Sequence, residues 1–368
     1  MSRPIRILYT IPNFVTAGSG QAMVNVIDRL DRRRFEPTVA VAKPGGDLVE
    51  HLRAQGVPVI VAQSSVPLTP LPTLPARIWK ARRAFRGQFD LWHSFNWAGD
   101  FTEPLIAYAS GARAWMYTKK NMGFATKSWR IRSLLARRIA VQNDAMPRRF
   151  FAKPWFRYKV RYVPTGIDVE PWQAAEPDPA LRDRLGVGPG DVLMTCVGDI
   201  QPRKNQASLV AALGEVERVH LVLAGRTLDA AYVDAMMAKA AELGIEDRVH
   251  LIGQVTDVPA LLKSSDVFAL ISHAEGSPIA MVEAMAIGLP VIASSIPGIS
   301  ERVTDGVDGF LVAPDDHPAL ARRLVDLAGS PELRQALGSA ARATTELRGR
   351  VEIEAARYET IYLELVPT

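Results

Sequence analysis

Glu275 and Glu283 stand eight residues apart in a segment whose residue types suit binding chemistry. Ser277 is a good N-cap and Pro278 suits the first helical position, so the pattern predicts a helix over Pro278–Ala286. Glu275 then lies in the loop before the helix, and Glu283 lies about a turn and a half inside it. Free N–H groups at a helix start bind phosphate, and nearby carboxylates accept hydrogen bonds from hydroxyls. The segment therefore suggests a site for a nucleotide attached to a sugar. Carboxylates that only serve the helix dipole are the alternative, although Glu283 sits too deep for that to be its main role.

Two neighbouring cations, Arg203 and Lys204, could bind the anionic part of such a ligand. They lie in the loop Gly198–Asn205, which follows the apolar run Val192–Val197. In a doubly wound sheet, ligands bind just after the carboxyl ends of the strands. We therefore expect Arg203 and Lys204 to neutralise a diphosphate, with a solvated basic turn as the alternative.

Glycines and histidines complete the candidate residues. Gly18, Ser19 and Gly20 follow the first predicted strand, and glycines let backbone amides approach a ligand closely. A tight turn is the alternative for them. His93 ends another predicted strand, where it either faces a ligand cleft or serves the structure. His273 belongs to the carboxylate segment and is expected to line its pocket as a wall residue.

The elements that must position these residues follow from an alternation of short apolar runs with amphipathic stretches. Strands are predicted at Ile5–Ile11, Pro37–Val41, Pro58–Val61, Leu91–His93, Arg113–Tyr117, Ile139–Val141, Val160–Val163, Val192–Val197, Val219–Leu223, Val249–Leu251, Val267–Ile271, Pro290–Ala293 and Phe310–Val312. Helices are expected between them, at Gln21–Leu30, Ala76–Arg86, Asn205–Leu213, Ala230–Leu243, Val258–Lys263, Pro278–Ala286 and Pro318–Leu327. This alternation predicts an α/β fold of two Rossmann-like, doubly wound domains that face a cleft.

The chain of 368 residues is too long for one ordinary core and suggests two domains. The proline-rich stretch Pro164–Pro179 is typical of a linker. We therefore expect an N-terminal domain at residues 1–164 and a C-terminal domain at residues 165–348. Residues 349–368 are expected to form a helix that packs back on the N-terminal domain.

The composition is that of a soluble globular protein, with 48% hydrophobic and 23% charged residues. No apolar run reaches the length of a membrane span, and the N-terminus does not resemble a signal peptide. A single cysteine, Cys196, fits a reducing, cytoplasmic setting, and its apolar neighbours predict a buried core residue. Residues 113–161 hold fourteen Lys or Arg and one acidic residue, so an anionic partner is expected for that segment.

Taken together, the motifs of the second half resemble those of the family-4 retaining glycosyltransferases of the GT-B fold. The resemblance is carried by Val197-Gly198, Pro202-Arg203-Lys204-Asn205, Leu223-Ala224-Gly225, Val249–Gly253, Asp266-Val267-Phe268, Glu275-Gly276-Ser277-Pro278, Glu283-Ala284-Met285-Ala286, Gly288–Val291 and Asp308–Val312. Val163–Asp168 looks like the hinge between the domains of that family. The first half is covered loosely, by the glycine segment and by Asp90–Ser94.

The resemblance implies roles for the candidate residues. Glu283 would hold the ribose of a nucleotide-sugar donor, either a UDP- or a GDP-sugar, and Glu275 would contact the donor sugar. Arg203 and Lys204 would stabilise the departing diphosphate. The remaining positions implied for donor binding are Gly198, His273, Gly276, Ser277, Pro278 and Ile279, and those implied for the acceptor side are Gly18, Ser19, Gly20, His93 and Lys119.

Two positions depart from the pattern of the family. Asp199 stands where the family often has an arginine, and it either pairs with Arg203 or turns away from the diphosphate. Lys119 stands where the family often carries a histidine, and it is expected to contact donor or acceptor instead. The chain has no Asp-X-Asp motif, so cationic side chains are expected to replace a metal, and no metal or other cofactor is expected.

The basic segment also contains apolar residues, among them Trp129, Leu134 and Trp155. Cations mixed with aromatic residues suggest an anionic membrane surface, where a lipid-linked acceptor would be found. The alternative is a core helix with a solvated basic face. Nucleic acid would suit the charge, but no nucleic-acid motif accompanies it.

The sequence thus predicts a retaining, metal-independent glycosyltransferase acting on a glycan or lipid-linked acceptor at the cytoplasmic face of a membrane. An epimerase or a phosphorylase on the same fold is an alternative within enzymes. A non-catalytic protein that binds nucleotide sugars or membranes is the alternative outside them.

Overall fold

The computed structural model describes residues 3–14, 17–96, 100–123 and 126–367. The chain divides into two compact units. Unit 1 comprises Met1–Gly166 together with Val351–Thr368, and unit 2 comprises Ile167–Arg350. Each unit is a parallel sheet flanked by helices, so the predicted class of two Rossmann-like domains is confirmed. The expected roles of the two domains, acceptor binding and donor binding, stay predictions.

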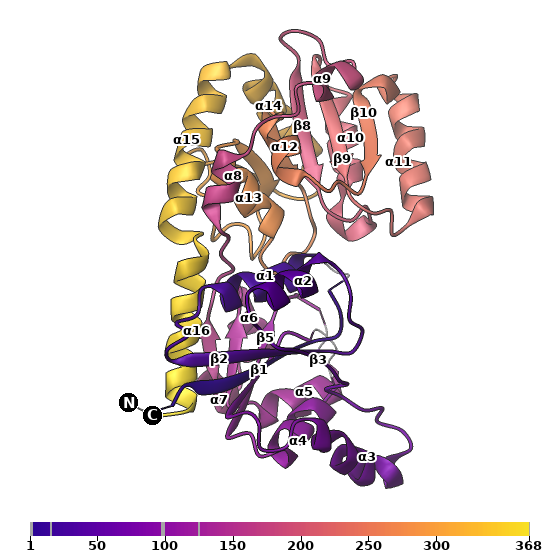
Figure 1. The fold of residues 1–368 in the computed structure, drawn as a ribbon. Helices are drawn as coiled ribbons and strands as arrows, with labels where there is room; N and C mark the ends of the chain where they lie inside the picture. The colour runs from indigo at the N-terminus through magenta and orange to yellow at the C-terminus, as the bar shows by residue number, and fades with distance from the viewer. Residues whose placement is uncertain (1–2, 15–16, 97–99, 124–125, 368) are drawn as a thin grey trace. The chain divides into compact units, whose positions relative to one another are not determined.

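Unit 1 is built on a seven-stranded parallel sheet in the order β3-β2-β1-β4-β5-β6-β7 (Figure 1). Its strands are β1 (Ile5–Ile11), β2 (Phe35–Val41), β3 (Val59–Val61), β4 (Leu91–Ser94), β5 (Ala114–Lys119), β6 (Arg138–Val141) and β7 (Val160–Tyr162). Its α-helices are α1 (Ala17–Asp28), α2 (Asp47–Ala54), α3 (Leu74–Ala81), α4 (Thr102–Ala109), α5 (Lys127–Leu135), α6 (Ala145–Phe150), α7 (Pro154–Arg157) and α16 (Val351–Leu365).

The apolar residues of β1 feed two separate cores, one on each face of this sheet. Ile7 and Tyr9 belong to the cluster under α1, α2 and α16, whereas Leu8 belongs to the cluster under α3, α4 and α5. Successive strand residues point to opposite faces, so a strand covered on both sides must be apolar throughout. That is why the sequence shows β1 as a continuous apolar run.

Unit 2 repeats the design with a six-stranded parallel sheet in the order β10-β9-β8-β11-β12-β13. Its strands are β8 (Val192–Val197), β9 (Val219–Ala224), β10 (Val249–Gly253), β11 (Val267–Leu270), β12 (Val291–Ser294) and β13 (Phe310–Val312). Its α-helices are α8 (Val169–Ala174), α9 (Leu181–Arg184), α10 (Gln206–Leu213), α11 (Ala230–Glu242), α12 (Val258–Lys263), α13 (Ile279–Ile287), α14 (His317–Gly329) and α15 (Pro331–Arg348). Cys196 is buried in this core, as predicted.

In both sheets the chain order reverses once, between β1 and β4 in unit 1 and between β8 and β11 in unit 2. Open α/β sheets bind their ligands at this switch point, outside the carboxyl ends of the two strands. The loops after β8 and β11 carry the cations and the carboxylate segment singled out from the sequence. The fold therefore brings the candidate residues of unit 2 to one place.

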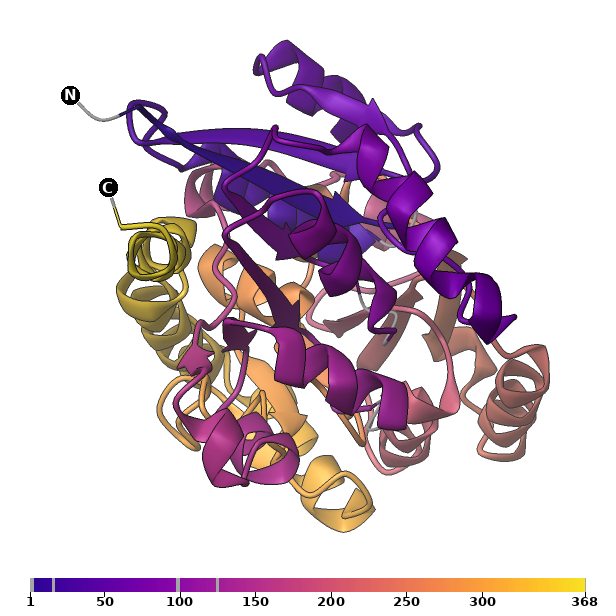
Figure 2. The ribbon, with the colours of Figure 1, turned by 90° about the horizontal axis from the view of Figure 1, so that it is seen from below.

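The C-terminal helix α16 completes unit 1, as predicted. Tyr358, Ile361 and Tyr362 lie in the same core cluster as β1. An ion pair between Arg29 Nε and Glu352 Oε1, 2.8 Å apart, adds to this packing at the start of the helix. Both views show the yellow helix beside the indigo strands of this unit (Figure 1; Figure 2).

Several predicted helix starts differ from the observed ones, among them those of α13, by one residue, and of α1, by four residues. Helix α13 begins at Ile279 with Pro278 as its N-cap, and the Ser277 side chain does not cap it. Helix α1 begins at Ala17, so Gly18, Ser19 and Gly20 form its first turn instead of a preceding loop. None of the described helices is long and apolar enough to cross a membrane.

Candidate functional site

A buried ion pair spans the switch point of unit 2. The Lys204 Nζ atom lies 2.7 Å from Oε1 of Glu275, with side-chain exposures of 14% and 8%. Arg203 lies beside this pair, with Nη1 3.9 Å from the same oxygen, and its side chain is 47% exposed. The structure therefore groups the three residues predicted to be catalytic, and it leaves the Arg203 guanidinium accessible to an anion.

The loop that carries the cations is held by its backbone. A short 3₁₀ turn, Pro202–Lys204, ends at Asn205, which adopts a left-handed conformation with φ 53°. The Asn205 side chain donates to the carbonyl of Pro314 at 3.0 Å, and His273 N donates to the carbonyl of Arg203 at 2.9 Å. These bonds fix the loop of the cations against the loops after β13 and β11.

Glycines at the ends of β8 and β9 allow a close approach of two backbones. Gly225 has φ 158°, and a Cβ atom placed on it would lie 2.0 Å from the carbonyl oxygen of Gly198. Gly198 itself has φ 152°. A side chain at Gly225 would force the strand ends apart, and a Cβ atom on Gly198 would lie 3.5 Å from Lys204 Nζ, so bare backbone lies next to this cation.

The turn after β12 packs on the carboxylate segment. A Cβ atom on Gly298 would lie 2.6 Å from the carbonyl oxygen of Gly276 and 2.9 Å from that of Glu275. Ser277 accepts a hydrogen bond from Arg302 Nη2 at 3.0 Å instead of capping the helix. Arg302 was not singled out from the sequence, where nothing distinguishes it from other arginines.

Glu283 lies one turn inside α13, half-buried, and burial raises the pKa of its carboxyl group to about 8. Among the described residues, no side chain forms a hydrogen bond or an ion pair with this carboxylate. A half-buried carboxylate without a protein partner is unfavourable in the empty protein. It is therefore suited to hydroxyl donors supplied by a ligand.

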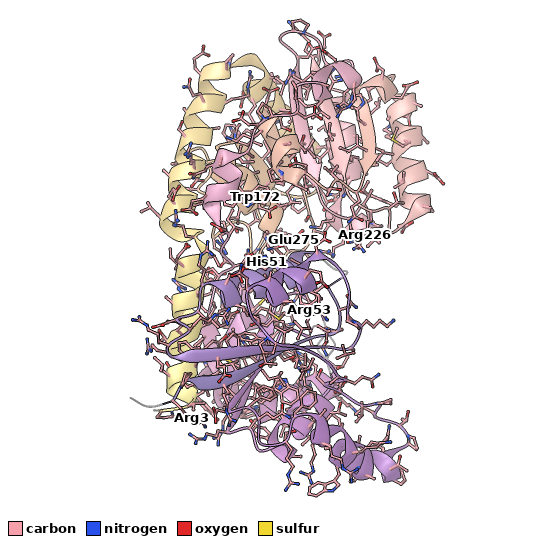
Figure 3. The ribbon with its side chains drawn as sticks, viewed as in Figure 1. Arg3, His51, Arg53, Trp172, Arg226 and Glu275 are labelled. Atoms are coloured by element: carbon pink, nitrogen blue, oxygen red, sulfur yellow. The ribbon has the colours of Figure 1, made fainter. Side chains whose placement is uncertain are left out.

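Asp199 forms a two-point ion pair with Arg226, at 3.0 Å for both Nε–Oδ1 and Nη2–Oδ2. Figure 3 labels Arg226 and Glu275, which follow β9 and β11 at the same edge of the sheet. Of the two options left open for Asp199, pairing with Arg203 is therefore wrong. Its actual partner, Arg226, lies 27 residues away in the sequence.

His273 stays at the rim of this group. Its imidazole is 43% exposed, and Nε2 lies 3.9 Å from Oδ1 of Asp315. Its backbone bond to Arg203 ties the two loops together, while its exposed ring agrees with the expected role of a wall residue.

The acceptor-side residues predicted in unit 1 differ in exposure. Gly18 is exposed, whereas Gly20 is buried, and a Cβ atom on Gly20 would lie 2.7 Å from Cδ1 of Phe14. The carbonyl of Ser19 accepts a hydrogen bond from Lys120 Nζ at 2.9 Å. Burial lowers the pKa of Lys120 to about 7, against the opposing effect of Glu354. Lys120 was not predicted from the sequence, although it stands in the same basic dipeptide as its neighbour Lys119.

Lys119 is buried, which contradicts its predicted contact with a ligand. Its Nζ atom donates to the carbonyl of Gly123 at 2.7 Å and lies 4.2 Å from the ring centroid of Phe150. Burial, with a smaller effect of Arg149, lowers the pKa of this lysine to about 8. Its ammonium group is used inside the unit.

His93 is also fully buried, so it serves the structure. Its Nδ1 lies 2.7 Å from Tyr362 Oη and its Nε2 lies 2.8 Å from Thr118 Oγ1. Burial lowers the pKa of this histidine well below its ordinary value. The imidazole therefore links β4, β5 and α16 and does not face a ligand.

Two doubly wound domains, with a cation–carboxylate group at the switch point of the second, fit the fold and site expected for a glycosyltransferase of the GT-B fold. Residues 178–344 match the family described as "Glycosyl transferases group 1". The chain is 29% identical over 360 residues to a D-inositol 3-phosphate glycosyltransferase of Streptomyces scabiei, covering 89% of this chain and 79% of that protein. Residues 178–344 thus match a glycosyl transferase family, and the chain is similar over most of its length to a family-4 (GT4) glycosyltransferase.

Other relatives agree with this assignment. A UDP-Gal:alpha-D-GlcNAc-diphosphoundecaprenol alpha-1,3-galactosyltransferase of Escherichia coli is 30% identical over 177 residues, covering 45% of this chain and 44% of that enzyme. The crystal structure of Anabaena HepE in complex with UDP and glucose superposes with a TM-score of 0.81 at 22% identity. That match covers 97% of this chain and 99% of HepE, which shows that the fold is shared along its length.

Proposed function

We propose that the protein transfers a sugar from a UDP- or GDP-sugar to a hydroxyl-bearing acceptor, with retention of anomeric configuration and without a metal ion. The observation that carries the proposal is the Lys204–Glu275 pair at the switch point of unit 2. Arg203 stands exposed beside it, and Glu283 holds a carboxylate that no described side chain pairs with. One edge of the sheet of unit 2 would then carry the two cations for the diphosphate, Glu275 for the sugar hydroxyls and Glu283 for the ribose.

The proposed mechanism relies on charge that develops during the reaction. Breaking the sugar–phosphate bond leaves negative charge on the nucleoside diphosphate. Arg203 and Lys204 would meet this charge, and fixed cations that interact more strongly with the transition state than with the substrate lower the barrier. Glu275 would position Lys204 and accept hydrogen bonds from the donor sugar. Retention of configuration is implied by the family resemblance alone.

The names of relatives support a nucleotide sugar as donor and leave the base open. HepE is described in complex with UDP and glucose, and the Escherichia coli relative is named for UDP-galactose. A relative of Mycolicibacterium smegmatis, 30% identical over 198 residues, is named as a GDP-mannose-dependent mannosyltransferase acting on a phosphatidylinositol monomannoside. Two of these names state lipid acceptors, which favours a lipid-linked or polysaccharide precursor for this chain.

The test combines ligand-induced stabilisation with turnover. We expect UDP or GDP to raise the melting temperature, because a ligand that binds only the folded state stabilises it. Glu275→Ala should abolish sugar transfer while keeping this stabilisation, and Glu242→Ala, on the exposed side of α11, should behave as wild type. Transfer should persist in EDTA. Absence of stabilisation by any nucleoside diphosphate would overturn the proposal.

The same assay separates the alternatives. Conversion of the donor sugar without an acceptor would show an epimerase, and a requirement for inorganic phosphate would show a phosphorylase. Nucleotide binding without turnover for any acceptor would favour a non-catalytic binding protein.

We further propose that unit 1 associates with an anionic membrane from the cytoplasmic side. The region α5–α7 exposes seven basic residues, namely Lys127, Arg130, Arg137, Arg148, Arg149, Lys153 and Arg157. It also exposes four apolar or aromatic side chains, Ile131, Leu134, Trp155 and Tyr158. The end of α7 is joined to α5, because Lys159 Nζ donates to the carbonyl of Leu134 at 2.6 Å. Basic side chains around apolar side chains are suited to the interface of a membrane that contains anionic lipids.

Burial restricts which residues can take part. Trp129 is 5% exposed and packs on Phe150 and Phe151, so it belongs to the core. Arg132 is 1% exposed and pairs with Glu103, so it faces inward. The predicted basic surface is therefore smaller than its sequence suggests.

Vesicle co-sedimentation tests the membrane proposal. Each Lys or Arg near an anionic surface contributes about 1 kcal/mol to the free energy of membrane binding. Replacing Lys127 and Arg130 by serine should therefore weaken binding to phosphatidylserine vesicles by roughly tenfold or more. A control with the same loss of charge, Arg322→Ser with Arg342→Ser in unit 2, should bind as wild type. No binding of the wild-type protein at low salt would refute the proposal.

A further inference from the structure

A buried arginine of unit 1 has no anionic partner in the protein. Arg82 lies in the 3₁₀ turn Arg82–Ala84 that follows α3, is 8% exposed, and has a buried Nε atom without a hydrogen-bond partner. Its guanidinium rests on the indole of Trp79, with Cζ 3.3 Å from the ring centroid. Burial, followed by the like charges of Arg86 and Arg83, lowers the pKa of Arg82. A desolvated charge without a counter-ion is unfavourable, and a cation–π contact offsets only part of that cost.

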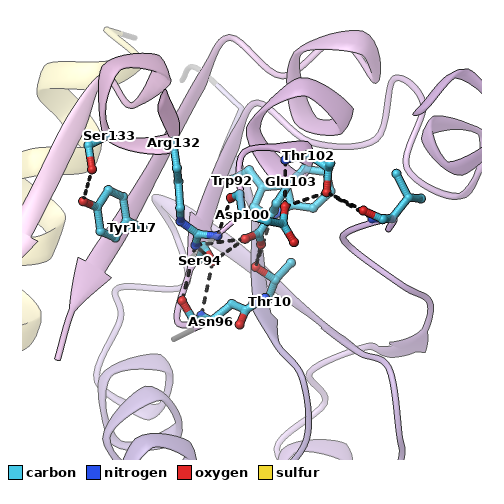
Figure 4. Close-up of polar contacts among 11 residues, drawn as sticks. Thr10, Trp92, Ser94, Asn96, Asp100, Thr102, Glu103, Tyr117, Arg132 and Ser133 are labelled. Carbon is cyan, nitrogen blue, oxygen red and sulfur yellow. Dashed lines mark hydrogen bonds and ion pairs between the residues drawn. The ribbon is translucent and has the colours of Figure 1, made fainter. Parts of the chain in front are cut away.

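Arg132, in the same layer of helices, is a buried arginine whose needs the chain does meet. Its side chain is 1% exposed, and Nη2 lies 3.0 Å from Oε2 of Glu103 and donates to Ser94 Oγ at 2.8 Å (Figure 4). Helices α3, α4 and α5 cover the same face of the sheet (Figure 1). Among the described residues, none supplies a carboxylate or a hydrogen-bond acceptor to the guanidinium of Arg82. The two arginines of one layer therefore differ in whether the protein itself provides the counter-ion.

The surroundings of Arg82 are basic and partly apolar. Residues 51–89 contain six Lys or Arg and no acidic residue. Lys80, Arg83 and Arg86 are exposed, and the side chain of Trp79 is 58% exposed. Such a surface complements an anion that is attached to an apolar body.

A second exposed apolar side chain, that of Leu71, is held next to α3 by a fixed loop. Arg77 of α3 donates from Nη1 to the carbonyl of Pro67 at 2.6 Å and from Nη2 to that of Pro70 at 2.7 Å. Leu71 follows directly, at the start of the 3₁₀ turn Leu71–Thr73, and is 65% exposed. The loop that presents this leucine is thus anchored to the helix that ends beside Arg82.

We propose that Arg82 binds the phosphate of an anionic phospholipid headgroup, while Trp79 and Leu71 enter the membrane interface beside it. A guanidinium donates two parallel hydrogen bonds to a phosphate, which is the counter-ion that the chain does not supply. Indole side chains favour the boundary between lipid headgroups and acyl chains. The inference rests on the proposed association of unit 1 with an anionic membrane, and adds a headgroup site outside α5–α7.

Co-sedimentation with phosphatidylglycerol vesicles tests the inference. Arg82→Gln and Trp79→Ala should each weaken binding about fivefold to tenfold. Arg82→Lys keeps the charge but loses the two-point geometry, so its affinity should lie between those of wild type and Arg82→Gln. The matched control is Arg53→Gln, which removes a charge paired with Glu50 at 2.7 Å on α2, on the opposite face of the sheet (Figure 3). This control should bind as wild type.

Thermal melting without lipid separates a binding role of Arg82 from a structural one. Because its charge has no anionic partner in the protein, Arg82→Gln should melt at the wild-type temperature or above it. An arginine that served only the fold would lower the melting temperature when replaced. Brominated phosphatidylglycerol should also quench a smaller fraction of the fluorescence in Trp79→Phe than in wild type.

The outcomes distinguish this inference from the proposals on which it rests. Wild-type vesicle binding by Arg82→Gln, or a lower melting temperature of this variant, would overturn the headgroup site and leave α5–α7 as the membrane contact. Binding of inorganic phosphate that requires Arg82, in a protein that binds no vesicles, would assign the site to free phosphate and overturn the lipid assignment. Absence of both kinds of binding would refute the membrane proposal together with the site. Hydrolysis of UDP-glucose needs no membrane and should be equal in all variants, so its absence in wild type would count against the transferase alone.

Discussion

The Glu283 carboxylate, which is proposed to hold the donor ribose, destabilises the protein when no ligand is bound. The folded protein raises its pKa to about 8, above the ordinary value of 4.5, so the folded state holds the proton more tightly than the unfolded state. Stability from this group is present at low pH and is lost as pH rises from 4.5 through about 8. We expect the free energy of unfolding of Glu283→Gln at pH 8.5 to exceed that of wild type by about 1–2 kcal/mol, since partial exposure screens the effect. The variant should therefore melt at a higher temperature.

The same variant should bind UDP or GDP more weakly, because an amide is a poorer acceptor for ribose hydroxyls than a carboxylate. Melting curves from pH 5 to 9, with and without nucleotide, measure both effects. The exposed Glu215→Gln serves as the control and should change neither. A variant that binds nucleotide as tightly as wild type would remove Glu283 from the site.

Arg226 should protect nucleotide binding although it was not predicted to be a site residue. It neutralises Asp199, which lies in the same loop as Arg203 and Lys204, the cations proposed to receive a diphosphate. Arg226→Met should weaken UDP or GDP binding by about tenfold, which corresponds to roughly 1.4 kcal/mol of repulsion. Adding Asp199→Asn should restore the affinity, as measured by titration calorimetry.

A matched ion pair at the other end of the same strand gives the control for this prediction. Arg218 precedes β9 and bonds Asp191 at 2.9 Å, far from the carboxyl edge of the sheet. Arg218→Met should leave nucleotide affinity unchanged. Equal affinities of Arg226→Met and wild type would mean that Asp199 does not face the diphosphate.

At this scale, the sequence predicts residues within one motif better than partners between motifs. Arg203, Lys204 and Glu275 were expected to lie together because their loops follow predicted strands, and the structure groups them. Arg226 was missed as the partner of Asp199, and Arg132 was counted only as part of the basic segment 113–161, because the partners of both arginines lie far away in the sequence. Only the assembled sheet brings such residues together, so charge alone cannot distinguish a buried arginine from a solvated one.

Two neighbouring strands of unit 2 carry a stacked pair of histidines. His220 Nδ1 on β9 lies 3.1 Å from His250 Nε2 on β10, with the rings 5.4 Å apart. Burial is the main cause that lowers the pKa of both; Asp191 opposes it at His220, and His220 adds to it at His250. Arg248, Arg182 and Asp247 are the other charges acting on the pair.

A fall in pH should therefore lower the free energy of unfolding of unit 2. As pH falls below about 6.5, the unfolded state binds protons before the folded state does, so stability declines. We expect His250→Gln to lose less stability than wild type between pH 7.5 and 5, as measured by chemical denaturation. His273→Gln removes an exposed imidazole and is the control. Parallel losses in wild type and His250→Gln would contradict the prediction.

Elements were predicted more securely than their ends. All thirteen predicted strands are present, because strands buried on both faces are continuous apolar runs. The starts of α1 and α13 were misplaced, since a side chain that suits a cap can find another partner, as Ser277 does with Arg302. Buried polar contacts of α16, such as Tyr362 with His93, have no local signal in the sequence.

At the scale of the whole molecule, the chain leaves unit 1, builds unit 2 and returns as α16. Each hydrophobic cluster of the described residues lies within one unit, so the two cores are separate. Ile361 belongs to the core of unit 1 although it lies near the end of the chain, and Leu324 belongs to the core of unit 2. Separate cores predict two unfolding transitions that respond to different substitutions.

Ile361→Ala should destabilise unit 1 by about 2–5 kcal/mol, the usual cost of emptying a buried aliphatic site. Leu324→Ala should cost unit 2 a similar amount. If donor binding resides in unit 2, UDP or GDP should raise only the transition that Leu324→Ala lowers, and the one lowered by Ile361→Ala should not move. Differential scanning calorimetry of the two variants, with and without nucleotide, measures this. The contrary outcome is a single transition that both substitutions lower and the nucleotide raises. It would show that the two units unfold as one cooperative body, with their stabilities coupled through the return of the chain as α16.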